Sequence, residues 1–181
     1  KLIEKGLIRS YGISNFSTNH LHQYHEIKNK ITTHQLFYNF LKRDIYEKIT
    51  KASSSFDHKF ILYGVLGRGI LTSKYFNKNY KKNTRASISN NVRADLKEKA
   101  IDELITFDTK LKEFNTNLLE YSIAEALSRK GVVSCVIGIR KINQLKEIIS
   151  IINKKIPIRN IKQYEPKNIS NLVNLGEPKI N

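Results

Sequence analysis

Short apolar runs alternate with longer amphipathic stretches along most of the chain. The apolar runs predict four buried strands, which cover Leu7–Ile13, Thr32–Phe37, Lys59–Tyr63 and Val132–Ile137. The first three recur about every 26 residues, close to the length of a strand–helix–strand unit. This alternation of strands and helices predicts an α/β fold with a parallel sheet.

Five amphipathic stretches are predicted as helices. Their apolar faces are marked by Leu21, Tyr24 and Ile27, by Ile45, Ile49 and Ala52, by Leu96, Ala100, Leu104 and Leu111, by Leu118, Leu119, Ile123, Ala126 and Leu127, and by Leu145, Ile148, Ile149 and Ile152. Ser17 is the expected N-cap of the first helix, and the second opens near Asp44. Each helix therefore has one apolar face that can pack against the sheet.

Two regions depart from this pattern. The insertion Phe76–Val92 is polar and rich in Asn, Lys and Ser, which predicts a mobile loop. All three prolines follow residue 152, where the repeated pattern stops. We therefore divide the chain into an α/β domain over residues 1–152 and an irregular or packing extension over residues 153–181.

The net charge of +16 raises the possibility of a nucleic-acid partner. The densest basic segment is Lys74–Arg85, in which Tyr75, Phe76 and Tyr80 stand between the cations. Charge runs of this kind usually solvate a loop, and the excess of Lys, Ile and Asn is typical of a biased genome. A basic nucleic-acid-binding domain is therefore the weakest alternative, and a basic surface also attracts a polyanionic cofactor.

Several function classes find no support in the sequence. The chain has no apolar run near the about 20 residues of a membrane span, and its start does not resemble a signal peptide. A single cysteine, Cys135, excludes a disulfide within the chain, favours a cytoplasmic setting and fits a small buried hydrophobe. His20, His22 and His25 cluster on the first predicted helix, but a metal site usually needs a further ligand from outside the helix. We therefore expect no metal site.

Polar residues and glycines follow the predicted strands at their carboxyl ends, where parallel α/β folds build ligand sites. The most suggestive segment is Gly64–Gly69, a glycine-rich loop that can expose backbone N–H groups to phosphate, with Arg68 adding charge. Its spacing is neither that of a P-loop nor that of a dinucleotide G-x-G-x-x-G motif. A plain tight turn therefore remains the alternative interpretation.

The other strand ends add an amide and a guanidinium. Gln35 lies near the end of the second predicted strand, and Arg140 follows the fourth, just before a helix. An arginine there suits a phosphate group through bidentate hydrogen bonds. The alternatives are a satisfied buried amide for Gln35 and a surface salt bridge for Arg140.

Four segments in this order resemble the aldo-keto reductase family over residues 1 to about 152. They are Gly6-Leu-Ile-Arg-Ser-Tyr-Gly-Ile-Ser-Asn-Phe-Ser17, Gln35-x-x-Tyr38-Asn39, Tyr63-x-x-Leu66-Gly67-Arg68-Gly69-x-Leu71-Thr72 and Gly138-x-Arg140-x-x-x-Gln144-x-x-Glu147. The resemblance implies a (β/α)₈ TIM barrel, of which this chain would hold strands five to eight with their helices. It also implies a metal-free oxidoreductase that reduces carbonyls with NADP(H).

The resemblance assigns cofactor contacts residue by residue. The nicotinamide carboxamide would be held by Ser14, Asn15 and Gln35, and Tyr63 would stack on the nicotinamide ring. The pyrophosphate would lie along Gly64, Leu66 and Arg68, and the adenosine end would be surrounded by Gly138, Arg140, Gln144 and Glu147, with Arg140 at the 2′-phosphate. The chain departs from the family pattern at Gly64, where Ser is common, and at Ile148, where Asn is common.

The family's catalytic tetrad of Asp, Tyr, Lys and His lies on earlier strands, so we expect no catalytic residue in this chain. Tyr38 belongs to a different segment and is expected to be structural. We expect a fragment of a longer protein, or a half barrel completed by another copy or another polypeptide, with a small carbonyl compound as substrate of the whole. The alternative is a non-catalytic, nucleotide-sensing relative of the family.

Overall fold

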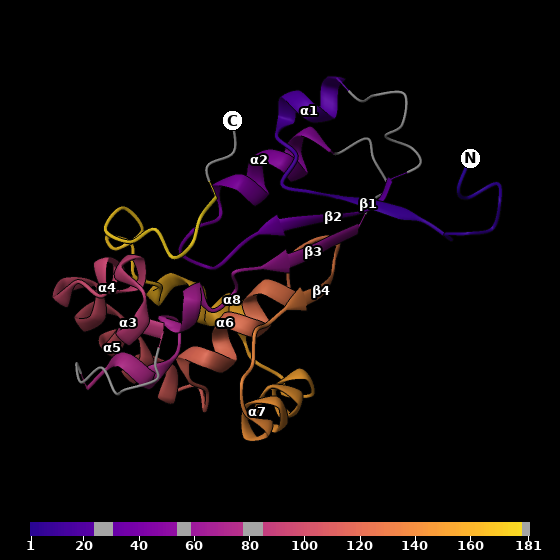
Figure 1. Ribbon diagram of the computed structural model, residues 1–181. Coiled ribbons are helices and arrows are strands. Elements are labelled where there is room, and N and C mark those ends of the chain that lie inside the picture. Colours follow the sequence, from indigo (N-terminus) through magenta and orange to yellow (C-terminus); the bar gives the residue numbers. More distant parts are fainter. Residues whose placement is uncertain (24–30, 54–58, 78–84, 179–181) are drawn as a thin grey trace.

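A computed structural model describes residues 1–23, 31–53, 59–77 and 85–178 (Figure 1). Its strands are β1 (Tyr11–Ser14), β2 (Ile31–Phe37), β3 (Lys59–Tyr63) and β4 (Val132–Val136). Its longer helices are α1 (Thr18–Gln23), α2 (Asp44–Ala52), α5 (Glu98–Lys112), α6 (Leu118–Leu127) and α7 (Ile142–Ile152). Shorter helical turns are η2 (Gly67–Gly69), η3 (Ser73–Tyr75), α3 (Arg85–Ile88), α4 (Asn90–Asp95), α8 (Ile158–Ile161) and η4 (Lys162–Tyr164).

The four strands form one parallel sheet in the order β1-β2-β3-β4. This confirms the α/β class and the parallel sheet expected from the sequence, and the architecture is consistent with part or all of a TIM-barrel-like fold. The register places Ser14 beside Gln35 and Gln35 beside Ile61. The carboxyl ends of all four strands therefore meet at one edge of the sheet.

One face of the sheet is covered, and the other is partly open. Leu36 and Leu62 on the covered face are fully buried, among side chains from α1, α2 and α6. On the opposite face Gln35 and Tyr63 are half-buried, and Val136 is 51% exposed. Right-handed crossovers between neighbouring parallel strands place the connecting helices on one side, which explains the asymmetry.

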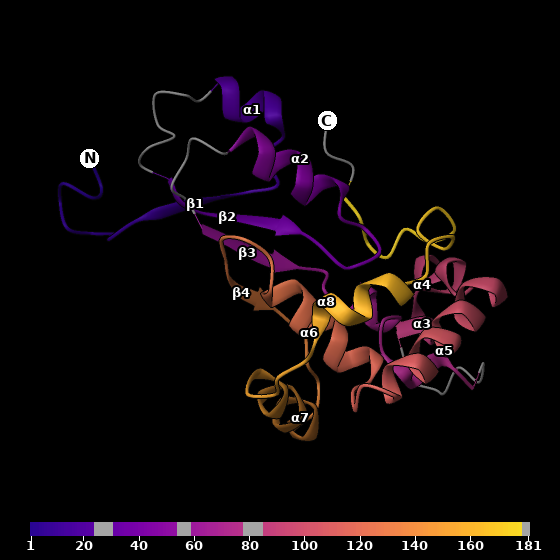
Figure 2. The same cartoon turned by 180° about the vertical axis from the view of Figure 1, so that it is seen from behind.

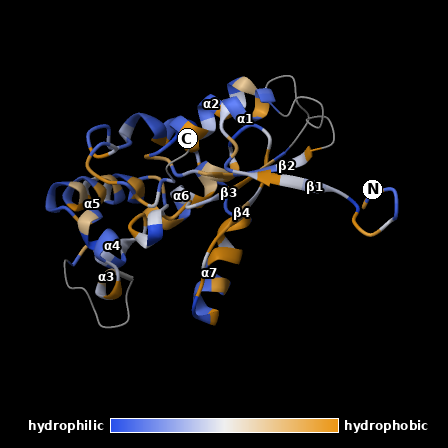
Figure 3. Ribbon diagram, turned by 45° about the horizontal axis from the view of Figure 1, so that its top comes forward, coloured by the Kyte–Doolittle hydropathy of each residue, from blue (hydrophilic) through white to orange (hydrophobic). Residues whose placement is uncertain are grey.

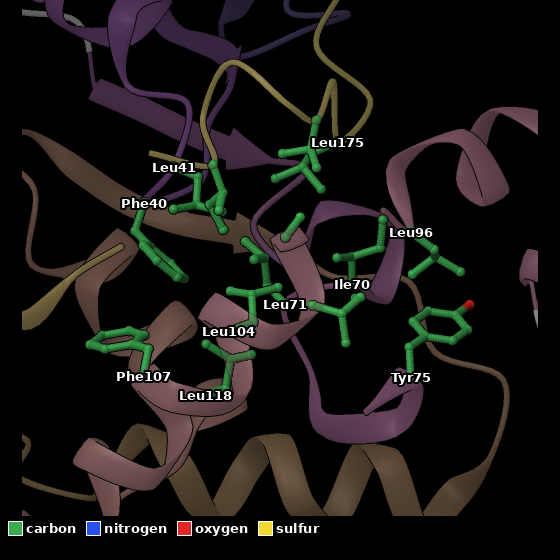
Figure 4. Packing of buried hydrophobic residues seen from close by; sticks show 14 of the residues in the cluster. Phe40, Leu41, Ile70, Leu71, Tyr75, Leu96, Leu104, Phe107, Leu118 and Leu175 are labelled. Carbon is green, nitrogen blue, oxygen red and sulfur yellow. The ribbon is translucent and has the colours of Figure 1, made fainter. Parts of the chain in front are cut away.

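A second core lies beyond the carboxyl ends of the strands (Figure 4). Leu71 and Leu104 are buried there with side chains of α5 and α6. The residues after 152 join this core through Ile161, Ile169 and Leu175, and α8 packs beside α6 (Figure 2). The predicted extension is thus of the packing kind, and the boundary at residue 152 stays a prediction.

The first strand is shorter than expected. The sequence predicts a strand over Leu7–Ile13, but β1 begins at Tyr11, and Leu7 is 68% exposed. Tyr11 pairs with Ile31, the first residue of β2, and none of the described residues pairs with residues 7–10. The expected cap of α1 is confirmed, since the Ser17 hydroxyl accepts a hydrogen bond from the His20 backbone N–H at 3.3 Å.

The described part of the predicted loop Phe76–Val92 contains α3 and the start of α4. Val92 is buried in the second core, which explains why this polar stretch is ordered into helix at its end. Tyr75 is also buried, so it is not a surface aromatic among the cations of Lys74–Arg85. Residues 78–84 of that basic segment lie outside the described residues.

Helix α7 differs from the other long helices. Its apolar side chains Ile142, Leu145, Ile149 and Ile152 are exposed, and only Ile151 is buried. Figure 3 shows hydrophobic stretches along α7, which projects away from the rest of the chain. Among the described residues, no helix is both long enough and apolar enough to cross a membrane.

Candidate functional site

A cleft of about 710 Å³ lies at the carboxyl ends of β3 and β4. Its lining brings together seven residues that the sequence assigned to a cofactor site: Tyr63, Gly64, Leu66, Arg68, Gly138, Arg140 and Gln144. Lys74 adds a further cation to the lining, and none of the described residues that line the cleft is an aspartate or glutamate. The cleft is therefore suited to an anionic ligand.

A larger groove of about 940 Å³ runs along α5 and contains none of the predicted site residues. Glu98, Asp102 and Glu103 line it together with Lys110 and Tyr164. It lies away from the strand ends, on the outer side of a helix that packs the second core. We therefore take the cleft at the strand ends as the candidate site, because parallel α/β folds place ligands there.

The loop after β3 is shaped by glycines in left-handed conformations. Gly64 has a φ of 78°, and its carbonyl accepts a hydrogen bond from the Gly67 N–H at 2.8 Å. The buried amide of Asn39 donates to the same carbonyl at 3.5 Å. A Cβ atom at position 64 would lie 2.6 Å from the Phe37 ring, so packing and φ both favour glycine at this position.

Two cations border this loop. Arg68 has a φ of 59° and lies between Gly67 and Gly69, which are also left-handed. Lys74 reaches back over the loop, since a Cβ atom on Gly69 would lie 2.6 Å from the Lys74 Nζ. The same ammonium lies 4.6 Å from the centroid of the Tyr75 ring. The sequence analysis grouped Lys74 only with the basic segment, because its return toward Gly69 depends on the fold of η3.

The ends of β1, β2 and β3 form a second part of the site. The Tyr63 hydroxyl donates to Asn15 Oδ1 at 3.1 Å, and the Asn15 N–H donates to the Gln35 carbonyl at 3.0 Å. Asn15 has a φ of 55°, a conformation that asparagine tolerates better than most residues. Ser14 is exposed beside Gln35. Ser14, Asn15 and Gln35 lie outside the lining of the cleft, and Tyr63, which lines it, connects Asn15 to the cleft.

The turn from β4 into α7 carries the remaining predicted residues. Gln144 Oε1 accepts hydrogen bonds from the backbone N–H groups of Arg140 at 2.9 Å and Lys141 at 3.1 Å. This side chain therefore caps the turn that presents Arg140. Glu147 is exposed on α7, outside the lining of the cleft, and Ile148 is half-buried. The positive end of the α7 dipole and the Arg140 guanidinium both favour an anion at this turn.

Tyr38 has a structural role, as expected. It is fully buried, and its hydroxyl donates to the Glu125 carboxylate at 2.7 and 2.9 Å. Glu125 also pairs with Arg129 and, at 2.9 Å, with Arg43, which in turn pairs with Glu165 at 2.5 Å. Burial, with the negative charge of Glu125, raises the pKa of the Tyr38 phenol far above its usual value. Tyr38 thus remains a phenol held inside a buried ionic network.

Cys135 is half-buried on β4 and packs against the core on the covered face of the sheet, so it is less buried than the sequence predicts. No cluster of three or more His, Cys, Asp or Glu side chains that could hold a metal occurs in the described part of the chain. Within the histidine cluster, His20 Nδ1 accepts a hydrogen bond from the Ser17 N–H at 3.2 Å. His25 lies outside the described residues.

The donor set fits a dinucleotide. Cations without carboxylates suit phosphate groups, and the close approach of Lys74 to Gly69 shows that a side chain at position 69 would fill the space above the loop. An amide and a phenol at the strand ends suit a planar, hydrogen-bonding ring. The arrangement can bind and orient such a ligand. The sequence analysis assigned these residues to cofactor binding and none of them to proton transfer.

Two solved structures show that this fold occurs in known proteins. A glycerol dehydrogenase from Gluconobacter oxydans superposes with a TM-score of 0.73 at 21% identity, covering 98% of this chain and 53% of the enzyme. An aldo-keto reductase from Bacillus halodurans, in its holo form, gives a TM-score of 0.63 at 18% identity, covering 98% of this chain and 55% of that one. The chain thus spans about half the length of the structures it matches.

Sequence comparison decides the family. None of the curated proteins compared with the chain matches it. Residues 1–169 match the model of the aldo/keto reductase family, which is nearly the whole chain. The four segments identified in the sequence fall within this match, and their residues meet at one edge of the sheet. The chain is therefore a member of the aldo/keto reductase family.

Proposed function

We propose that this chain is the NADP(H)-binding half of an aldo-keto reductase-like oxidoreductase and corresponds to strands five to eight of the barrel. The intact protein would reduce a small carbonyl compound reversibly. The observation that carries the proposal is the cleft lined by Arg68, Lys74 and Arg140, without a carboxylate among its described residues. Such a lining favours a ligand with several phosphate groups.

Each part of the site has a task in this proposal. Arg68 and Lys74, with the backbone from Gly64 to Gly69, hold the pyrophosphate, and Leu66 lines the cleft beside them. Arg140 holds the 2′-phosphate, and Gly138, Gln144 and Glu147 flank the adenosine end. Tyr63 stacks on the nicotinamide ring, while Ser14, Asn15 and Gln35 hold the carboxamide. NADPH supplies the hydride, and this chain positions the ring that carries it.

Protonation of the carbonyl oxygen requires a general acid, and we assign that role to no residue of this chain. We place the catalytic Asp, Tyr, Lys and His on the other half of the barrel, either upstream on the same polypeptide or on a separate one. β1 and β4 each have one edge without a partner strand among the described residues. These edges and the apolar stripe of α7 are the surfaces on which we place that half.

The test is Arg140→Ala in the intact protein. If Arg140 holds the 2′-phosphate, the substitution raises the Kd for NADPH about tenfold or more and leaves the Kd for NADH nearly unchanged. Fluorescence titration with both nucleotides measures the ratio. Arg159→Ala is the matched control, because Arg159 is an exposed arginine on α8 outside the cleft.

Other outcomes would separate the alternatives. An unchanged preference for NADPH in Arg140→Ala would contradict the assigned role of Arg140. NADPH binding by the intact protein with no turnover of any carbonyl compound would favour the nucleotide-sensing alternative. No nicotinamide-nucleotide binding, together with nucleic-acid binding that weakens steeply with salt, would favour the nucleic-acid alternative.

A further inference from the structure

Residues 174–177 of the chain, called the tail segment here, lie against the loop that carries Arg68. A Cβ atom on Gly176 would lie 2.8 Å from Arg68 Nε and 3.4 Å from its Cζ, so the guanidinium lies directly over the Gly176 backbone. Leu175 is fully buried, and its side chain would lie 3.2 Å from a Cβ atom on Gly67. Leu175 and Gly176 also line the cleft. The tail segment thus forms one side of the site.

One carboxylate fixes this segment to the body of the protein. Asp95, at the end of α4, is buried, and its two oxygens accept hydrogen bonds from consecutive backbone N–H groups. Asp95 Oδ1 accepts from Asn174 at 2.7 Å, and Oδ2 accepts from Leu175 at 3.0 Å. An ion pair between Lys42 and Glu177 at 3.3 Å holds the next residues.

We propose that Asp95 is a positioning residue for the cofactor site, which it serves without touching the cofactor. By fixing the backbone at residues 174 and 175, it holds Gly176 under the guanidinium and keeps Arg68 directed into the cleft. This inference rests on the proposed function, in which Arg68 binds the pyrophosphate of NADP(H). It assigns a part of the site to a segment more than 100 residues from Arg68 in the sequence.

The chemistry of Asp95 makes its removal specific. Only a carboxylate presents two acceptor oxygens to two adjacent N–H groups, and the amide of an asparagine would turn a donor toward one of them. Asp95→Asn therefore releases the tail segment while it preserves the volume of the side chain. The chain also offers a matched control. Asp108 is a second buried aspartate, whose carboxylate accepts from the Leu118 N–H at 2.8 Å at the junction of α5 and α6.

The experiment measures ligand affinity in the intact protein. We expect Asp95→Asn to raise the Kd for NADPH about tenfold and to leave the Kd for adenosine 2′-monophosphate unchanged, because this probe lacks the pyrophosphate. Asp108→Asn lowers the melting temperature without changing either Kd. In an Arg68→Ala background, Asp95→Asn has no further effect on the Kd for NADPH, because its action passes through Arg68.

Three results would overturn the inference. If Asp95→Asn weakens NADPH binding equally with and without the Arg68 side chain, its effect is a general structural one. The same conclusion holds if Asp95→Asn weakens the binding of NADPH and of adenosine 2′-monophosphate equally. If Asp95→Asn does not fold, Gly176→Ala replaces it, since the added Cβ displaces the Arg68 side chain directly. An unchanged Kd for NADPH in that variant would also overturn it. Failure of the unaltered protein to bind NADPH would instead refute the proposed function, and the role of Asp95 with it.

Discussion

Helices α5 and α7 have similar apolar stripes but opposite surroundings. In α5 the stripe that includes Ile101, Leu104 and Phe107 is at most 2% exposed, packed against α6 and the residues after 152. In α7 the corresponding stripe, which includes Leu145 and Ile149, is 42 to 53% exposed at these two positions. The same periodicity thus gives a core helix in one place and an unpartnered face in the other.

The difference shows what hydrophobic periodicity determines. It fixes which side of a helix is apolar, but the partner must come from elsewhere in the structure. For α5 the partner is in this chain, whereas for α7 none of the described residues covers the stripe. The partly open face of the sheet resembles α7 in this respect, because the apolar side chain of Val136 is also exposed.

The largest expected effect on stability is in the well-packed region of α5 and α6, at the ionic network around Glu125. Glu125→Ala should lower the free energy of unfolding by about 3–5 kcal/mol, because it removes a fully buried carboxylate that pairs with the half-buried Arg129 and is one of the two carboxylates paired with Arg43. Urea denaturation measures the change. Glu113→Ala is the control, since its ion pair with Lys110 is exposed and should contribute less than about 1 kcal/mol.

If Glu125→Ala and Glu113→Ala lower the free energy of unfolding by equally small amounts, the buried network does not stabilise the well-packed region. Because Arg43 also pairs with Glu165, the network connects α6 with the residues after 152. Its loss should therefore increase proteolysis of that segment as well.

The second prediction compares the two helices directly. Leu104→Ala should destabilise this chain by about 2–5 kcal/mol, because it removes a fully packed side chain. Leu145→Ala should change the stability of the same chain by less than about 0.5 kcal/mol, since Leu145 is already 42% exposed. Chemical denaturation of both variants measures the contrast.

The same pair of variants can sharpen the comparison. In the intact protein, packing of the other half on α7 would raise the cost of Leu145→Ala to more than about 1 kcal/mol. A cost that stays negligible there would show that α7 remains uncovered, and the proposed place of the other half would be wrong.

The smallest expected effect concerns Cys135 on β4, the strand at the open edge. Burial raises the pKa of its thiol to about 11 from an ordinary value near 9. The neutral thiol is thus favoured in the folded chain, and its contribution to stability is full below pH 9 and is lost as the pH rises toward 11. Alkylation by iodoacetamide should follow an apparent pKa of about 11 in the folded chain.

In urea the same reaction should follow the ordinary thiol pKa, which provides the control. A folded chain that reacts with an apparent pKa near 9 would show that β4 opens readily. That result would show that β4, like the apolar stripe of α7, is poorly protected from solvent.

Much of the fold could be predicted because its elements have local causes. Apolar runs located the four strands, and Ser17 located the start of α1. The first strand was predicted too long, because a strand depends on its neighbour and none of the described residues pairs with residues 7–10. The short helices near Val92 were missed because a polar stretch gives no helical pattern, and burial of Val92 against a distant core decides the outcome.

The candidate site was predictable in part for the same reason. Residues at the ends of β3 and β4 were found from their positions, and the structure brings Tyr63, Arg68 and Arg140 into one cleft. Lys74 could not be assigned, because its ammonium reaches Gly69 only through the turn η3. The contribution of Gly176 depends on a contact between distant parts of the chain, which no local pattern records.

The conformations of Arg68 and Leu175 have a consequence for engineering. Both are non-glycine residues with positive φ, 59° and 52°, and both line the cleft. Such backbone strain costs on the order of 1 kcal/mol at each position, which a glycine would relieve. A library selected for heat resistance alone would therefore enrich glycine at position 68 and discard the arginine. It would keep Leu175, because loss of that buried side chain costs more than the strain. Selection should be run with the nucleotide present, so that stability is not gained at the expense of the site.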